Sequence, residues 1–174
     1  VLLKTEGGVG HGRNHLRLGP DGLIYVVHGN DIYEAREYDK QSPLKHYEED
    51  QLIPNPWDDE WFNRRAFVPA GHILRMDKDG KKIEMIAGGL RNPLDIDFNA
   101  DGEPFVYDAD MEWESALAWY KPTRVLHIVS GADYGWRRAT GKWPAYYEDS
   151  LPAAYDVGLG SPTGIEFGYR SHFP

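Results

Sequence analysis

Cysteine is absent from this 174-residue chain, and so are long apolar runs and an excess of basic residues. Without cysteine there are no disulfides, no thiolate zinc sites, no cysteine nucleophile and no covalently attached haem. No apolar run approaches the roughly 20 residues that a membrane-spanning helix needs. Lys and Arg number 19 against 28 Asp and Glu, a net charge of −9, which disfavours binding to nucleic acid or anionic lipid. We therefore expect no nucleic-acid partner and no membrane span.

The composition is that of a globular protein with a hydrophobic core. Hydrophobic residues make up 41% and aromatic residues 13% of the chain, which is more than disordered chains contain. A chain of 174 residues is long enough for one domain. Because Val1 and Pro174 both interrupt strand-like patterns, we expect residues 1–174 to be part of a longer protein.

The clearest local signal is a β-hairpin. Apolar and polar residues alternate over residues 94–98, which is the pattern of a strand with one buried face. The turn is Asp101-Gly102, where glycine accepts the positive φ that a tight hairpin needs. Arg91-Asn92 precedes the first strand, and Asp108 and Asp110 follow the second. In an antiparallel pair these two places lie at the same end, where we expect the chemistry.

The pattern of strand, Asp-Gly turn and strand occurs at residues 16–27 and again at 94–107, and a second hairpin follows each copy. Repeated units of four antiparallel strands are typical of β-propeller blades. We predict an all-β chain with about two full blades and the start of a third, whose first strand is residues 164–167. Because a ring needs about four to eight blades, we expect the rest of the propeller or a partner chain to close it. A β-sandwich is the alternative fold.

Residues 30–70 differ from the repeats and are predicted to form an inserted loop. They are rich in acidic residues, aromatic residues and proline. Within them Asn55-Pro56 favours the start of a helix, which we expect to run over residues 55–65. A second irregular loop is predicted for residues 137–160.

His11, Arg91 and Asn92 are the candidates for catalysis and binding. An imidazole such as that of His11 accepts a proton near physiological pH, although most histidines are surface or hydrogen-bonding residues. The guanidinium of Arg91 suits a carboxylate ligand, or else it pairs with Asp95 or Asp108 within the fold. Asn92, directly before proline, is either a ligand or a turn residue.

Residues 108–114 contain four carboxylates, those of Asp108, Asp110, Glu112 and Glu114. Calcium prefers oxygen ligands of this kind. The spacing lacks the glycine and the bidentate glutamate of an EF-hand loop, and a solvated acidic loop is the alternative. We predict that calcium binds here through carboxylates or carbonyls.

Five short motifs, taken in order, resemble the soluble pyrroloquinoline-quinone (PQQ) glucose and sorbosone dehydrogenases. The motifs are His11 with Gly19-Pro20-Asp21-Gly22, Gly71-His72-Ile73-Leu74-Arg75-Met76 with Asp79-Gly80, Leu90-Arg91-Asn92-Pro93, Ala132-Asp133-Tyr134-Gly135-Trp136 and Gly160-Ser161-Pro162-Thr163-Gly164. They cover about residues 10 to 170. The loop at residues 110–114 is similar to that of a little-characterised bacterial branch of the family.

The resemblance implies a six-bladed propeller that binds PQQ and calcium and oxidises a small sugar by hydride transfer to the quinone. It implies that His11 is the general base and that Arg91 and Asn92 hold the cofactor. It implies that the backbone carbonyls of Asp110 and Met111 ligate the metal. It also implies a periplasmic or secreted location.

Three positions depart from the family pattern: Gly10 replaces the acidic neighbour of the base, Asn14-His15 replaces Gly-Arg, and Gly29-Asn30 replaces Gly-Asp. Two other functions therefore stay open. One is a non-catalytic propeller that binds carbohydrate or protein, which the change at Gly10 favours. The other is a calcium-dependent lactonase or hydrolase propeller.

Overall fold

The structure is a computed structural model that describes residues 1–8, 10–34, 37–47, 68–110, 120–137, 142–144, 146–169 and 171–172. Within these ranges the chain forms ten β-strands and no helix. The strands are β1 (Thr5–Gly7), β2 (Arg13–Leu18), β3 (Ile24–His28), β4 (Ile32–Glu34), β5 (Gly71–Met76), β6 (Ile83–Leu90), β7 (Ile96–Phe98), β8 (Pro104–Asp108), β9 (Thr123–His127) and β10 (Tyr155–Gly158). The predicted helix at residues 55–65 lies outside the described residues, as does much of the predicted loop around it.

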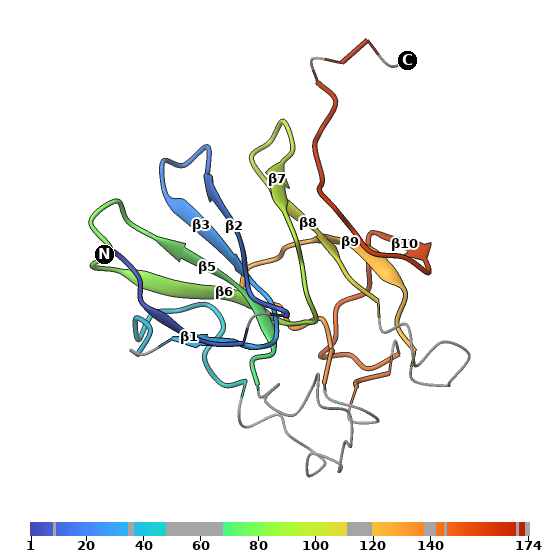
Figure 1. The fold of residues 1–174 in the computed structure, drawn as a ribbon, viewed down its shortest axis with the longest axis horizontal. Helices are drawn as coiled ribbons and strands as arrows, with labels where there is room; N and C mark the ends of the chain where they lie inside the picture. The colour runs from blue at the N-terminus through green and yellow to red at the C-terminus, as the bar shows by residue number, and fades with distance from the viewer. Residues whose placement is uncertain are drawn as a thin grey trace.

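Two four-stranded antiparallel sheets form the body of the molecule (Figure 1). Their strand orders are β2-β3-β5-β6 and β7-β8-β9-β10, so each sheet is built in chain order. A small third sheet pairs β1 with β4. Two consecutive four-stranded units confirm the prediction of two full blades.

The turns that begin each unit adopt the predicted conformation. The strands β2 and β3 pair from Leu18↔Ile24 onward, and β7 and β8 pair from Phe98↔Pro104 onward. Gly102 has φ +83°, a value that a residue with a Cβ rarely adopts. The Asp-Gly signal in the sequence therefore located both hairpins correctly.

The fourth strand of the second sheet was not predicted, and the predicted strand at 164–167 is not a strand in the structure. β10 lies inside the segment that was expected to be an irregular loop, and its pairing with β9 shifts register between Asp156 and Gly158. The first three residues of β10 are all exposed, so no alternation of buried and exposed positions marks it in the sequence. In the segment 164–167, the backbone amide of Phe167 instead donates to the carboxylate of Asp97 on β7.

The hydrophobic core lies between the two sheets. It joins Tyr25 and Val27 of β3 to Ile96 of β7 and Val106 of β8. Val27, Ile96 and Val106 are completely buried. Burial of this apolar surface at roughly 25 cal/mol per Å² is the main force that holds the two blades together.

The first strands of the two sheets, β2 and β7, come together at the inner edge of the fold (Figure 1). Arg17 Nη2 lies 2.7 Å from Asp97 Oδ1, and His15 Nε2 lies 3.2 Å from Asp95 Oδ1. The backbone amide of Phe167 in turn donates to Asp97 Oδ2 at 2.6 Å. Polar side chains therefore link β2 to β7, and β7 to the segment that contains Phe167.

The face of β2 that points away from the second blade carries exposed apolar side chains. Leu16 and Leu18 are 64% and 63% exposed, whereas the equivalent residues of the second unit, Ile96 and Phe98, pack against the first blade. A cavity of about 570 Å³ lined by Leu16, Val26 and other residues lies on the same side. This face has the properties of a surface that another sheet covers.

We expect residues 1–174 alone to self-associate through this face. Changing Leu16 and Leu18 together to Ser should reduce the association, because it removes exposed apolar area that drives it. Light scattering coupled to size exclusion measures the effect, and Val129→Ser, at a residue that is 41% exposed, is the control. A parent chain that is a monodisperse, cooperatively melting monomer would contradict the prediction.

Candidate functional site

Four of the predicted site residues, His11, Arg91, Asn92 and Asp108, lie at one end of the two blades. His11 lies just before β2, Arg91 and Asn92 lie between β6 and β7, and Asp108 is the last residue of β8. The backbone carbonyl of Arg91 accepts a hydrogen bond from Asn30 N at 2.8 Å, and that of His11 accepts one from Asp31 N at 3.2 Å. The loops that follow β3 and β6 thus join the two blades at this end.

His11 is 6% exposed and is oriented by the side-chain amide of Asn30. Its Nδ1 lies 2.8 Å from Asn30 Oδ1. An amide oxygen only accepts hydrogen bonds, so Nδ1 carries the proton and Nε2 carries the lone pair. Nε2 is the atom that a general base uses.

The pKa of His11 is lowered from its ordinary value of 6.5, mainly because burial disfavours the charged imidazolium and also because of the positive charge of Arg91. The hydrogen bond to Asn30 and the charges of Asp31 and Asp108 oppose this shift. The neutral imidazole, which is the form that accepts a proton, is therefore favoured at neutral pH.

Asp108 is completely buried and connects three parts of the site. Its Oδ1 accepts from the backbone amides of Asn92 at 2.8 Å and Ala109 at 3.0 Å, and its Oδ2 accepts from that of Arg91 at 3.1 Å. The guanidinium of Arg124 binds Oδ2 at 3.2 Å. These donors occupy the carboxylate, so its role in the structure is to fix the Arg91-Asn92 turn. The predicted use of this carboxylate as a calcium ligand stays untested.

Arg91 and Asn92 are held from both blades. Arg91 is 3% exposed, and Asn92 Oδ1 accepts a hydrogen bond from Asn14 Nδ2 at 2.7 Å. A Cβ on Gly29 would lie 2.5 Å from the carbonyl oxygen of His11 and 2.6 Å from Asn92 Oδ1. Only glycine allows this close approach, which brings the His11 loop against the Arg91-Asn92 turn.

Asp110 is another buried carboxylate, with 1% exposure. Its Oδ2 accepts from the hydroxyl of Tyr120 at 2.8 Å and from Gly160 N at 3.4 Å. Its Oδ1 is buried without a hydrogen-bond partner in the part of the chain that the structure describes. Met111 and Glu112 lie outside the described residues. Among the residues that are described, no three His, Asp or Glu side chains gather closely enough to hold a metal ion.

The cationic side chain of Lys121 follows Tyr120 in the chain and lies near Arg124. Its pKa is lowered to about 8, because burial and the positive charges of Arg124 and Lys142 disfavour the ammonium form. Asp156 and Asp133 oppose the shift. A part of the Lys121 population is therefore neutral at slightly alkaline pH.

Sequence reasoning assigned no role in the site to Asn30 and Arg124, and it considered Tyr120 only as a residue that lines a sugar site or packs under the acidic loop. Asn30 was noted only as a departure from the family pattern. Neither Tyr120 nor Arg124 is near its partner in sequence, since Tyr120 binds Asp110 and Arg124 binds Asp108. The pairing of β8 with β9, which places Asp108 opposite Arg124, was the missing information.

No family model matches this sequence, and no curated protein matches it either. Several solved structures are similar to it, two of which share its fold over most of the chain. The PQQ-bound aldose sugar dehydrogenase of Streptomyces coelicolor aligns over 92% of this chain with a TM-score of 0.57 and 18% identity. A putative oxidoreductase (glucose dehydrogenase) of Thermus thermophilus aligns over 88% of the chain with a TM-score of 0.58 and 21% identity.

The chain has the propeller fold of these dehydrogenases. This finding confirms the predicted all-β propeller and excludes the β-sandwich alternative. The chain spans 42% of the Streptomyces enzyme and 41% of the Thermus protein, so it corresponds to part of one propeller. Within the described residues no helix is long and apolar enough to span a membrane.

Proposed function

We propose that this chain is part of a PQQ-dependent sugar dehydrogenase and that its site binds the cofactor and takes a proton from the substrate. The observation that carries the proposal is His11, buried, favoured in its neutral form and oriented by Asn30 beside the Arg91-Asn92 turn. The fold shared with two dehydrogenase structures supports it. From the resemblance to this family we also propose that the protein is periplasmic or secreted.

Two atoms fit the groups that such an enzyme binds. Asn30 Nδ2 is a buried donor next to His11 that has no hydrogen-bond partner among the described residues, and it suits an oxygen of the quinone cofactor. Asp110 Oδ1 is a buried acceptor that also has no hydrogen-bond partner among the described residues. It suits a cation such as calcium. A donor and an acceptor left without partners in the folded chain each cost free energy that a ligand would recover.

Each residue then has one task. Arg91 offers a planar set of donors for one of the three carboxylates of PQQ. Asp108 fixes the backbone of Arg91 and Asn92 and so determines where those donors lie. When bound, PQQ supplies the hydride acceptor and calcium supplies positive charge beside it. His11 Nε2 accepts the proton of the sugar hydroxyl, which raises the electron density on the carbon that loses hydride.

Reconstitution of the full-length protein with PQQ and calcium tests the proposal. We expect tight quinone binding, calcium binding by calorimetry, and reduction of a redox dye in the presence of aldoses. Arg91→Ala should weaken quinone binding by roughly 10- to 100-fold, because it removes charged hydrogen bonds. If no quinone binds to the parent protein, the dehydrogenase proposal fails and a carbohydrate- or protein-binding propeller takes its place.

The lowered pKa of His11 predicts the pH dependence of the reaction. The acidic limb of kcat/KM should lie below pH 6.5, because His11 must be neutral to accept a proton. Asn30→Asp should move that limb to higher pH by about one unit, since a carboxylate at this position stabilises the imidazolium. Steady-state rates measured over about four pH units, from about pH 5 to about pH 9, include the ordinary pKa of histidine. They give the position of the acidic limb in the parent and its shift in Asn30→Asp. Identical profiles for the two proteins would contradict the assignment of His11 as the base.

The same shift has a consequence for stability. The unfolded chain binds a proton to His11 more readily than the folded chain, so stability rises with pH through the titration range. Below pH 6.5 the free energy of unfolding therefore decreases, because protonation of His11 favours the unfolded chain. His11→Gln places a side chain that does not titrate at this position. It should therefore weaken the dependence of the free energy of unfolding on pH.

A further inference from the structure

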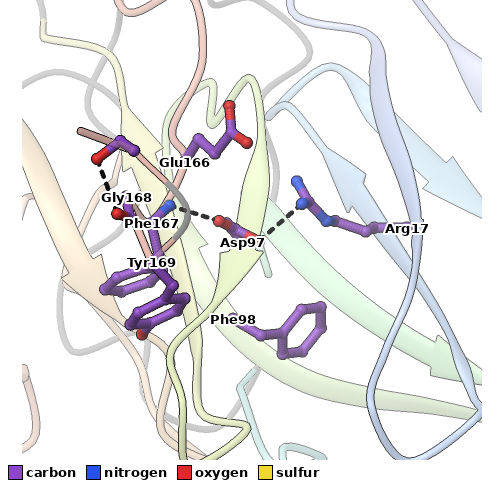
Figure 2. A pocket seen from close by; sticks show the side chains of 8 residues that line it. Arg17, Asp97, Phe98, Glu166, Phe167, Gly168 and Tyr169 are labelled. Carbon is purple, nitrogen blue, oxygen red and sulfur yellow. Dashed lines mark hydrogen bonds and ion pairs between the residues drawn. The ribbon is translucent and has the colours of Figure 1, made fainter.

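A cavity of about 600 Å³ lies at the inner edge of the fold, away from the candidate site. Arg17 lines it from the far end of β2, and Asp97 and Phe98 line it from β7. His11 and Arg91 precede these two strands, so the cavity is at the opposite end of the strands. Its other wall is the C-terminal segment, with Glu166, Phe167 and Tyr169 (Figure 2).

The polar groups of the cavity are fixed in place. Arg17 and Asp97 point toward each other from neighbouring strands (Figure 2), with Nη2 and Oδ1 2.7 Å apart. Arg17 Nη1 donates to the carbonyl of Ile96 at 3.0 Å, and Phe167 N donates to Asp97 Oδ2 at 2.6 Å. Arg17 nevertheless keeps 35% of its side chain exposed and lines the cavity. Glu166 adds an exposed carboxylate on the opposite wall.

The aromatic groups form an ordered surface beside these polar groups. The rings of Phe167 and Tyr169 are stacked, with centroids 5.5 Å apart and an angle of 5° between the planes. Phe105 contacts the edge of this pair at 5.1 Å from Phe167 and holds it against β8. Tyr169 is 58% exposed and lines the cavity together with Phe167.

The combination selects one ligand chemistry. Arg17 and Asp97 offset each other's charge across their ion pair, and the carboxylate of Glu166 adds negative charge, so the lining disfavours an anionic ligand. Fixed donors and acceptors beside a flat aromatic face suit a molecule that has several hydroxyl groups and an apolar C–H face. We propose that this cavity binds a neutral sugar ring, as a second carbohydrate site that is separate from the candidate site at the other end of the strands.

The test uses the full-length protein without PQQ, so that sugar oxidation does not occur. Calorimetry with maltohexaose and cellohexaose measures binding. Tyr169→Ala should raise the dissociation constant by roughly three- to tenfold, because the aromatic surface is lost. Tyr155→Ala is the matched control, since Tyr155 is also an exposed tyrosine but lies on β10. Tyr169→Leu keeps an apolar side chain but removes the aromatic ring, and it should bind as weakly as Tyr169→Ala. The melting temperature of each variant shows whether a loss of binding comes from a loss of structure.

Further measurements distinguish binding at this cavity from binding at the candidate site. They also test which ligand charge the cavity accepts. His11→Ala and Arg91→Ala should bind the hexaoses as the parent does, so the site stands even if the dehydrogenase proposal fails. Negatively charged galacturonate oligomers should bind more weakly than the neutral hexaoses. The proposal is overturned if neither hexaose binds at millimolar concentration, if Tyr169→Ala binds as the parent does, or if His11→Ala abolishes binding.

Discussion

Changing His11 to Ala in the full-length protein, reconstituted with PQQ and calcium, is expected to lower turnover by a factor on the order of 10²–10⁴. The loss follows from the removal of Nε2, the atom that we assign to the substrate proton. Quinone binding should change little, because Arg91 and Asn92 keep their backbone contacts with Asp108. The decrease should therefore appear in kcat rather than in the affinity for the cofactor.

Two variants make this measurement specific. His127→Ala removes another histidine, one that pairs with Glu103 at 3.7 Å on β9, and it should leave turnover unchanged. His11→Gln keeps a polar side chain of similar length near Asn30 but accepts no proton, so its turnover should fall as far as that of His11→Ala. Activity of His11→Ala equal to that of the parent would refute the assignment of the base, and with it the proposed mechanism.

The sequence predicted the fold well where turn chemistry and burial agree. Asp101-Gly102 marked a hairpin whose strands have one buried and one polar face, and the same pattern at Asp21-Gly22 revealed the repeat. β10 was missed because it is a short edge strand with exposed side chains and an irregular register. Edge strands lack the burial pattern that makes inner strands visible in a sequence.

The candidate site was predicted in part for a similar reason. Hairpin geometry alone placed Asp108 beside the Arg91-Asn92 turn, and the structure confirms that contact. It gave no information on Asn30 or Arg124, because their contacts depend on how the His11 loop and β9 pack against that turn. Arg124 is the partner that makes Asp108 a structural residue. Sequence spacing identified the residues at this end, and the pairing between them required the fold.

The largest effect on stability is expected for Asp108→Asn in the full-length protein, with a loss of about 3–5 kcal/mol. The side chain is completely buried, and its negative charge is the ion-pair partner of Arg124, which is itself 4% exposed. Asparagine removes that charge and leaves the guanidinium buried without compensation. Its amide nitrogen also points a donor at groups that are themselves donors. Urea unfolding measures the change.

The control and a second variant show whether the ion pair is the cause. Asp79→Asn should cost less than about 0.5 kcal/mol, because Asp79 pairs with Lys81 at an exposed site. Adding Arg124→Met to Asp108→Asn should recover part of the lost stability, since no unpaired charge is then buried. The double variant should still bind quinone poorly, because the amides of Arg91 and Asn92 lose the carboxylate that orients them. If Asp108→Asn is as stable as Asp79→Asn and binds quinone normally, Asp108 does not organise the site.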